Sequence, residues 1–419
     1  MTNSIKPGDR LHAPNVNGGR RRVLAGMAGA SLIAMAPVRH VFAQPVVKIG
    51  VVLAKQGPFA QQAGDMAKGI QMAVEDLGRK MGGKPMEIVW LDEPNPQVAV
   101  QNFTKLVDQE NVIAVLGGSN SPTSLAMGAT ALQRRVPFIS INAAAREVTG
   151  KDCNPFLFRM AASVPVYARA MAPHLLTAGK RWYILSGSYA FGEDVINTFT
   201  EIAKVSGATI VGVDRAPVAT TDYSSFVLKA RAARPEVLIS GAPNVEPILK
   251  QVRELAMSGS VTVAGAAVSD TDLWSASPDS LGGIYGKTWY YNDPSNSSEE
   301  QAFTKRFIAS EGRPPSDRVF FGWHSMYLLA AAIDHAKSSE RVAITQALTA
   351  MKLSDGGLTF GFRDWDHQLT RRVVVAAAQQ NPKDKWDILK VRSAKPTSAD
   401  ELNRLYGSNA EVGCKMAPI

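Results

Sequence analysis

The chain has 419 residues, of which 45% are hydrophobic and 20% are charged, and its formal net charge is +9. This length suits two domains of ordinary size, and the composition is that of a globular protein rather than a disordered or fibrous one. Residues 1–43 carry six Lys and Arg residues and one Asp, which leaves +4 for residues 44–419. That remainder is scattered and forms no basic patch interleaved with aromatic residues, which argues against a nucleic-acid partner.

The N-terminus has the features of a twin-arginine export signal. An arginine triplet lies within residues 19–24, a small-residue apolar stretch covers 23–36, and residues 41–43 fit the small-x-small rule for signal cleavage. The alternative is a membrane anchor, but the apolar stretch is short for a bilayer span of roughly 20 residues. We therefore expect a cleaved signal peptide over residues 1–43 and a periplasmic mature protein that begins at Gln44.

The mature chain opens with a strand, a loop and a helix. Residues 47–53 form an apolar run typical of a strand buried on both faces, and Gly57-Pro58 marks the loop. A helix follows from about Gly64, because apolar residues recur there at helical spacing up to Leu77. In an open α/β sheet, the loop after such a strand is where small ligands bind.

The same unit repeats along the chain. Further strands are predicted at 86–91, 112–116 and 136–141, with helices between them, and the pattern restarts near 158–165. Strands at 181–186, 209–213, 237–240, 261–264 and 284–290 then alternate with helices, and helices at 299–310, 320–336 and 343–351 precede short strands at 356–362 and 372–378. Beyond Asn381 the chain is polar and turn-rich. The pattern predicts an α/β fold with two Rossmann-like lobes, each built on a parallel sheet.

Signatures of catalysis and metal binding are weak. The six histidines show no metal-ligand spacing, and we find neither a phosphate-binding loop nor a dinucleotide fingerprint. We therefore expect no enzyme, no metal and no cofactor. Two cysteines are present, Cys153 and Cys414, and a disulfide is reasonable in an oxidising compartment. Two unrelated buried thiols are the alternative, since a Cα separation cannot be read from a sequence.

Two strand-end loops carry the candidate ligand-binding residues. After Gly117-Gly118, the side chains of Ser119, Asn120 and Ser121 lie beside a helix start whose N–H groups are free to bind a carboxylate. Plain helix capping by Ser121 is the alternative reading. In the second lobe, Tyr189 and Phe191 could close over a ligand, with core packing as the alternative.

Six segments together resemble the type I periplasmic solute-binding proteins of ABC importers, nearest to the leucine/isoleucine/valine-binding branch. They are residues 48–76, LGGSNSPTS (116–124), PFISINAAAREVT (137–149), FRMAAS (158–163), SYAFGED (188–194) and FGFRDWDHQ (360–368). The resemblance implies two lobes joined by three crossing strands that close over a ligand like a hinge. The crossings would fall near 159–164, near 290–292 and after Phe362. Lobe 1 would comprise residues 44–162 and 292–378, and lobe 2 residues 163–291 and 379–419.

The resemblance also implies where a ligand binds. In amino-acid-binding members, the positions that resemble Ser119–Ser121 and Ala143-Ala144 hold the ligand carboxylate. A hydroxyl residue is typical where this chain has Ala144, and a tyrosine is typical where it has Ala63. The acidic residue that pairs with the ligand's ammonium is replaced by Ala267, and Asp270 is the candidate substitute.

These features predict an exported solute receptor that delivers a small amino acid or related carboxylate to an inner-membrane ABC permease. Two alternatives stay open. One is a sensor that uses the same lobes to signal to a membrane partner. The other is a receptor for an aromatic or aliphatic acid that lacks the ammonium group, because a buried ammonium without a carboxylate partner costs several kcal/mol.

Overall fold

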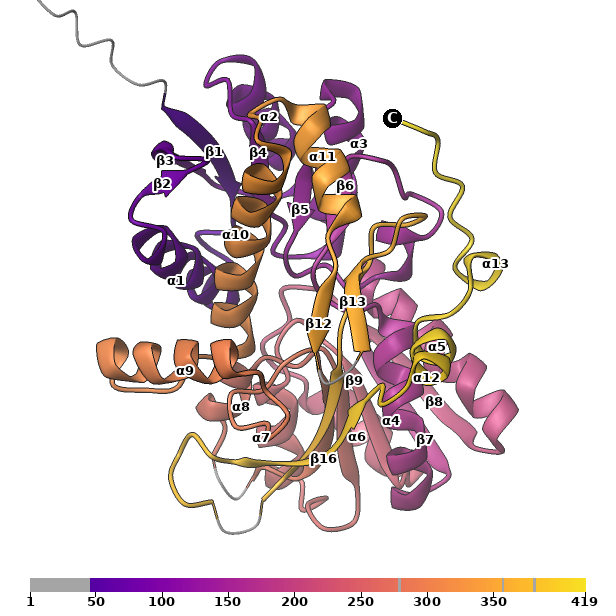
Figure 1. The fold of residues 1–419 in the computed structure, drawn as a ribbon. Helices are drawn as coiled ribbons and strands as arrows, with labels where there is room; N and C mark the ends of the chain where they lie inside the picture. Colours follow the sequence, from indigo (N-terminus) through magenta and orange to yellow (C-terminus); the bar gives the residue numbers. More distant parts are fainter. Residues whose placement is uncertain (1–45, 278–279, 356–357, 380–381) are drawn as a thin grey trace, which may run out of the picture. The chain divides into compact units, whose positions relative to one another are not determined.

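The computed structural model of the chain describes residues 46–277, 280–355, 358–379 and 382–419. The predicted signal peptide over residues 1–43 and the predicted mature start at Gln44 lie outside these ranges. Helices and strands alternate through the described chain, and most strands belong to two large sheets (Figure 1). The predicted α/β class with two mostly parallel sheets is confirmed.

The first sheet has six strands in the order β2-β3-β1-β4-β5-β6, and all neighbours pair in parallel except β2 with β3. The strands are β1 (Val47–Val52), β2 (Lys80–Met81), β3 (Lys84–Leu91), β4 (Ala114–Gly117), β5 (Phe138–Ser140) and β6 (Leu157–Arg159). Helices α1 (Ala60–Asp76), α10 (Asp317–Ala336) and α11 (Arg341–Ala350) pack on one face, and α2 (Pro96–Asp108) and α3 (Ser121–Arg134) pack on the other.

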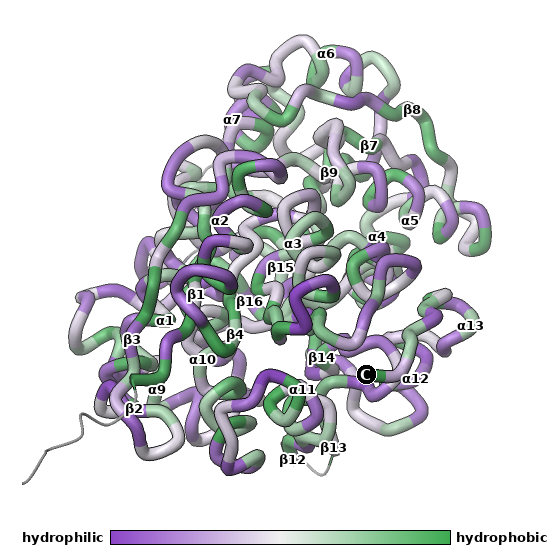
Figure 2. Tube along the Cα trace, turned by 90° about the horizontal axis from the view of Figure 1, so that it is seen from above, coloured by the Kyte–Doolittle hydropathy of each residue, from purple (hydrophilic) through white to green (hydrophobic). Residues whose placement is uncertain are grey.

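Strand β1 shows why helices cover both faces of this sheet. Ile49 and Val51 belong to the core with α1 and α10, whereas Val52 belongs to the core with α2 and α3. Successive side chains of a strand point to opposite faces, so an uninterrupted apolar run must be buried on both. The apolar residues of the strands are green in Figure 2.

The second sheet has seven strands in the order β16-β15-β11-β10-β9-β7-β8. Strands β7 (Arg181–Gly187), β8 (Thr209–Ala216), β9 (Val237–Gly241), β10 (Thr262–Ala266) and β11 (Gly283–Lys287) are parallel, whereas β15 (Val373–Ala378) and β16 (Leu389–Lys395) pair antiparallel. Helices α4 (Val164–Ala178) and α5 (Ala190–Ser206) pack on one face, and α6 (Ser224–Ala233), α7 (Glu246–Glu254) and α8 (Asp270–Ser275) pack on the other.

The chain passes between the two sheets three times. The passages lead from β6 to α4, from β11 to α9 (Ser298–Glu311) and α10, and from β14 (Leu369–Thr370) to β15. Strand β14 also pairs with β13 (Leu358–Phe362), which pairs with β12 (Leu353–Asp355). A bridge between Arg159 and Gln368 ties the first passage to the third.

Two expectations from the sequence differ from the observed structure. The predicted division grouped residues 292–378 with lobe 1, but β15 pairs with β11 in the second sheet. The exact division into lobes stays a prediction. The region beyond Asn381, expected to be only polar and turn-rich, contains β16, α12 (Ala399–Tyr406) and α13 (Asn409–Val412). Strand β16 lies at a sheet edge and alternates few apolar residues with Lys and Arg, so its strand signal is weak.

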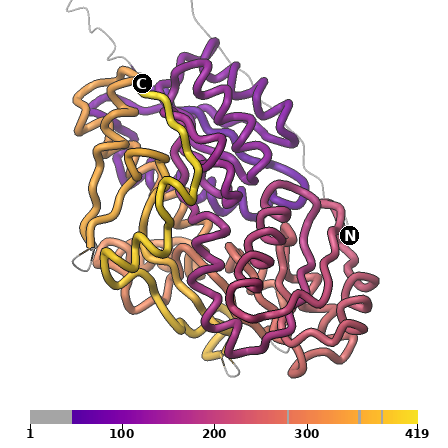
Figure 3. Tube along the Cα trace, turned by 90° about the vertical axis from the view of Figure 1, so that its right-hand side faces the viewer, coloured from indigo at the N-terminus to yellow at the C-terminus, as the bar shows by residue number. Residues whose placement is uncertain are grey.

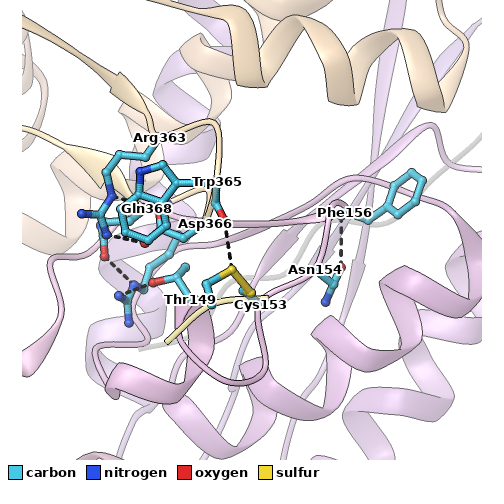
Figure 4. Close-up of a disulfide and its surroundings, with 10 residues drawn as sticks. Thr149, Cys153, Asn154, Phe156, Arg363, Trp365, Asp366 and Gln368 are labelled. Carbon is cyan, nitrogen blue, oxygen red and sulfur yellow. Dashed lines mark hydrogen bonds and ion pairs between the residues drawn. A yellow bond between two sulfur atoms is a disulfide. The ribbon is translucent and has the colours of Figure 1, made fainter. Parts of the chain in front are cut away.

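The C-terminal segment runs from β16 back to the part of the chain that contains the first sheet (yellow in Figure 3). There Cys414 forms a disulfide with Cys153, which lies in the loop before β6 (Figure 4). The Cα atoms are 5.8 Å apart, within the range that a disulfide can bridge. The bond therefore fastens the tail to residues near the first passage.

Reduction of this disulfide should lower the thermal unfolding midpoint of residues 44–419. The two cysteines are 261 positions apart, so the bond restricts most of the unfolded chain. The chain-entropy account assigns roughly 5 kcal/mol to a loop of this length. The double variant Cys153→Ser/Cys414→Ser should unfold at the lower midpoint with or without reductant. Equal midpoints for the oxidised wild type and this variant would contradict the expectation.

Candidate ligand-binding site

A cavity lies at the loops that follow the strands of both sheets, and its space, including its mouth, measures about 490 Å³. The lining residues are Phe59, Gln62, Ser119, Asn120, Ser121, Asn142, Ala144, Tyr189, Phe191, Ser240, Ala242, Pro243, Val245, Ala266, Ala267, Val268, Asp272 and Arg318. Seven of the nine predicted ligand-binding residues are among them; Ala143 and Asp270 are not.

The loop after β4 is shaped by two glycines. Gly118 has a φ of +81°, and a Cβ there would lie 2.1 Å from Ser124 Oγ. A Cβ on Gly117 would lie 2.1 Å from the carbonyl oxygen of Val52. Only glycine fits both positions, and the turn they form leads the chain directly into the cavity wall at Ser119.

The hydrogen bonds of this loop show which of its polar groups already have partners within the protein and which can still bind a ligand. Ser119 is fully buried, and its Oγ accepts a bond from the N–H of Ala54 at 3.0 Å. Asn120 caps α3, because its side chain accepts from the N–H of Thr123 at 3.0 Å. The expected alternative of capping by Ser121 is therefore wrong: Ser121 is the first helical residue. Its Oγ accepts from the N–H of Ala145 at 3.2 Å and still has a proton to donate.

A buried glutamate that we did not predict binds the same loop. Glu93, 1% exposed, accepts from the N–H of Ser119 at 2.5 Å and from that of Gly118 at 3.2 Å. Burial raises the pKa of Glu93 to about 8, although these hydrogen bonds oppose the rise. The N–H groups of Gly118 and Ser119 are therefore already bound to a carboxyl group of the protein, and Ser119 is one of the residues expected to hold a ligand carboxylate.

In the loop after β5, Ala144 lines the cavity, whereas Ala143 packs in the core with α2 and α3. The polar residue that contributes here is Asn142. Its Nδ2 donates to the carbonyl oxygen of Ser119 at 2.9 Å and to Gln62 Oε1 at 3.2 Å. Asn142, in the loop after β5, thus joins α1 to the loop after β4.

Aromatic side chains from both sheets form an apolar wall. The ring centroids of Tyr189 and Phe191 are 5.8 Å apart, and those of Tyr189 and Phe59 are 6.0 Å apart. Tyr189 and Phe191 follow β7 and were predicted; Phe59 follows β1 and was not. Burial raises the pKa of Tyr189, so its hydroxyl keeps its proton and can donate. This wall suits an apolar or aromatic group of a ligand.

A cluster of buried charges stands beside the cavity. The Nζ of Lys287 lies 2.9 Å from Asp270 and 3.2 Å from Asp317, and it donates to the carbonyl oxygen of Val268 at 2.7 Å. Arg318 Nη1 lies 2.8 Å from the same carboxylate of Asp317. All four side chains are at most 3% exposed. Two cations and two carboxylates balance each other, which is what the cost of burying charge requires.

Asp270 is therefore not available as the substitute acid. Besides its contact with Lys287, it accepts from the N–H of Asp317 at 2.9 Å, and it does not line the cavity. The carboxylate that does line the cavity is Asp272, 4% exposed. Gln62 Nε2 donates to its carboxyl group at the long distance of 3.4 Å, and burial raises the pKa of Asp272 to about 7. Within the described ranges, Asp272 forms no ion pair.

Arg318 is the cationic group of the cavity, and the sequence analysis missed it. Its Nη2 donates to the carbonyl oxygen of Ala267 at 2.5 Å, and its Nε donates to Gln62 Oε1 at 3.4 Å. Ala267 has a left-handed backbone with a φ of +57°, which is uncommon for a residue with a Cβ and typical of functional loops. A signal was present: Arg318 stands in the first turn of α10, a helix that is rich in apolar residues and mostly buried.

Comparisons with known proteins agree with this geometry. A sequence profile described as "Periplasmic binding protein" matches residues 46–384. Leu/Ile/Val-binding protein homolog 6 from Brucella suis biovar 1 (strain 1330) is 25% identical over 315 residues, which are 71% of this chain and 80% of that protein. A periplasmic binding protein from Burkholderia mallei has a TM-score of 0.80 at 23% identity, covering 88% of this chain and 98% of its own.

A third similar protein was solved with a ligand. This solute binding protein of an ABC transporter from Rhodopseudomonas palustris BisB5, in complex with 3,4-dihydroxy benzoic acid, has a TM-score of 0.76 at 20% identity and covers 83% of this chain and 96% of its own. The chain belongs to the periplasmic binding protein family, whose members are solute-binding transport proteins rather than enzymes. The predicted resemblance is confirmed. Among the described residues, no helix is both long and apolar enough to cross a membrane.

Replacing Asp270 or Asp272 by Asn should have different effects on the free energy of unfolding. Asp270→Asn removes one carboxylate from the buried Lys287 and should lower the free energy of unfolding by roughly 3 to 5 kcal/mol. Asp272→Asn removes a carboxylate that has no cation of its own, so the free energy of unfolding at pH 8 should stay equal or rise. Chemical denaturation of both variants at pH 8 tests this contrast. A loss of stability in Asp272→Asn as large as that in Asp270→Asn would overturn the assignment.

Proposed function

We propose that this protein is the periplasmic substrate-binding component of an ABC importer, which captures an α-amino acid with an apolar side chain and delivers it to the inner-membrane permease. One observation carries the ligand class: Asp272 and Arg318, both buried, line the same aromatic-walled cavity. A zwitterion with an apolar side chain complements a carboxylate, a cationic donor and an apolar wall. The likeness to a Leu/Ile/Val-binding homolog supports the same class.

Asp272 is the partner that we assign to the ligand's ammonium group. The cluster of Lys287, Arg318 and two aspartates contains two positive and two negative charges. An ionised Asp272 therefore adds one uncompensated negative charge beside the cavity. Burial raises the pKa of Asp272 to about 7, although the charges of Arg318 and Lys287 oppose the rise. A bound ammonium would supply the missing cation in a desolvated site, where charge-assisted hydrogen bonds are strong.

The ligand carboxylate has to use groups that Glu93 does not occupy. The N–H and hydroxyl groups of Ser121 and the N–H of Ala144 belong to residues that line the cavity, and they fit this role. Pro122 has no N–H, and the N–H of Thr123 is bound to the Asn120 side chain. Arg318 lines it as well, with guanidinium protons beyond those already donated to Asp317, Ala267 and Gln62.

Closure around the ligand is supported by hydrogen bonds from α1, beside the first sheet, to elements that follow strands of the second sheet. Gln62, on α1, donates to the carbonyl oxygen of Pro243 after β9 at 3.1 Å. Asp65, also on α1, accepts from Thr271 Oγ1 of α8 at 3.0 Å. A solute that touches both sets of loops favours the conformation in which these contacts form. Capture then needs no covalent chemistry. We further propose that residues 1–43 direct export and are cleaved.

A second candidate ligand class is an aromatic acid. The related Rhodopseudomonas palustris protein binds 3,4-dihydroxy benzoic acid, and the cavity here has three aromatic side chains in its wall. Such a ligand requires Asp272 in its neutral form, in which the carboxyl group donates a hydrogen bond instead of repelling a second carboxylate. The pKa of about 7 makes this form accessible in mildly acidic solution.

Thermal unfolding of residues 44–419 against a panel of amino acids and aromatic acids separates the two classes. A ligand that binds only the folded state stabilises it by about 2.7 kcal/mol at 100 times its dissociation constant. We expect leucine-like amino acids to raise the midpoint and benzoate-like acids to have less effect at pH 8. A panel in which only acids without an amine raise the midpoint would refute the amino-acid assignment.

The pH dependence of binding provides an independent test. Because the pKa of Asp272 is raised to about 7, its carboxylate is lost as the pH falls below 7. Amino-acid affinity should therefore decrease from pH 7 to pH 5, approaching tenfold per pH unit, whereas aromatic-acid affinity should increase.

Asp272→Asn should remove this dependence and raise the amino-acid dissociation constant at pH 8 at least 30-fold, about 2 kcal/mol, as loss of a buried charge partner does. The exposed Asp400, which does not line the cavity, provides the matched control Asp400→Asn. Titration calorimetry of the three proteins at both pH values gives the comparison. Wild-type affinity in Asp272→Asn would exclude Asp272 from the site.

A further inference from the structure

A second cavity lies between α10 and the small sheet β12–β14. Its space, including its mouth, measures about 1150 Å³, more than twice that of the first cavity, and the two have no lining residue in common. Its apolar walls are formed mainly by six side chains: Phe320, Trp323, Tyr327 and Leu328 of α10, Phe360 of β13 and Leu369 of β14. Three aromatic residues on one helix face give it flat surfaces that suit an aromatic ring.

The polar side of this cavity is formed by Arg371 and His324. Arg371 Nη2 donates to Glu300 Oε1 at 2.7 Å, and its Nη1 lies 3.4 Å from His324 Nδ1. A guanidinium group can only donate, so Nδ1 of His324 is the acceptor and the ring proton is on Nε2. Burial and the charge of Arg371 lower the pKa of His324 to about 3, which keeps the ring neutral.

Nε2 of His324 is therefore a donor, and no hydrogen bond from it to a described residue is found. His324 is half-buried and lines the cavity, so an acceptor atom of a ligand can reach this donor. The Nε of Arg371 is buried on the same side and also has no acceptor in the described ranges.

The charges around the cavity are balanced. Arg371 is paired with Glu300, and the exposed Lys352 and Glu299 at the lining carry opposite charges. A charged ligand would gain no net attraction and would lose its hydration on entering apolar walls. An uncharged molecule with one acceptor oxygen avoids that cost and satisfies the unpaired donor.

We propose that the cavity between α10 and β12–β14 is a second ligand site, which binds a flat, uncharged aromatic molecule with its acceptor oxygen at His324 Nε2. The ring lies among Trp323, Tyr327 and Phe360. Because Arg371 begins the third passage between the sheets, just after β14, the site is built partly on a segment that has to move when the sheets change their relation.

The test uses 4-iodophenol as the probe with the oxidised protein, residues 44–419. A soaked crystal should show an anomalous iodine peak in this cavity, and calorimetry in solution should show binding. Iodobenzene has the same ring without the oxygen, and it should bind at least tenfold more weakly. 4-Iodobenzoate, which is charged, should not produce a peak there. Equal affinity for 4-iodophenol and iodobenzene would overturn the proposal.

Three variants test where 4-iodophenol binds and whether His324 donates to its oxygen. His324→Phe keeps the ring and removes the donor, so the dissociation constant of 4-iodophenol should rise at least tenfold. Ala331→Trp fills the cavity from an exposed position on α10 and should abolish binding. Phe191→Ala lies in the wall of the first cavity and should leave 4-iodophenol binding unchanged. Loss of binding in Phe191→Ala, or none in Ala331→Trp, would assign the probe to another place and overturn the proposal. The comparison of the two probes on wild-type protein remains decisive if a variant fails to fold.

Discussion

The fully buried ammonium group of Lys287 fixes the positions of the elements beside the first cavity. It lies at the end of β11 and is held by Asp270 at the start of α8 and Asp317 at the start of α10. Removing a charge from water is costly unless its partners are fixed around it, so the three elements must meet at this point. Two of these elements belong with the second sheet, whereas α10 packs on α1 beside the first. One ion cluster therefore fixes the relation between the loops of both sheets.

The position of the ligand-facing groups follows from this cluster. Asp317 also binds Arg318, which turns the guanidinium group toward the carbonyl oxygen of Ala267. The short helix α8, anchored by Asp270, presents Asp272 to the cavity two residues later. Residues at i and i+2 of a helix point to different sides, so one aspartate can neutralise the lysine only if the other faces elsewhere. We propose that stability and ligand recognition are divided between these two acids, which lie two residues apart in the sequence.

The sequence sufficed for the central strands and for one loop of the cavity but not for this division. Hydrophobic runs located the central strands, and Gly117-Gly118 before three polar residues located one wall of the cavity, because those signals are local. The choice between Asp270 and Asp272 depends on Lys287 and Asp317, which are 17 and 47 positions from Asp270 and meet it only in the fold. Glu93 was missed for the same reason: it reaches Ser119 across 26 positions. Polar residues that meet only in the folded protein leave no periodic pattern in the sequence.

Glu93 is also the reason why we assign ligand recognition to helix starts rather than to strand-end amides in this chain. Its carboxyl group holds the N–H groups of Gly118 and Ser119, and a ligand carboxylate at the same donors would bring two anions together in a desolvated place. Alanine at positions 144 and 267 leaves only backbone groups to bind there. Three polar side chains of the cavity lining, Ser121, Asp272 and Arg318, each lie within the first three residues of α3, α8 or α10. The strand-end loops thus shape the cavity, whereas the charges that we propose for ligand selection come from the helices.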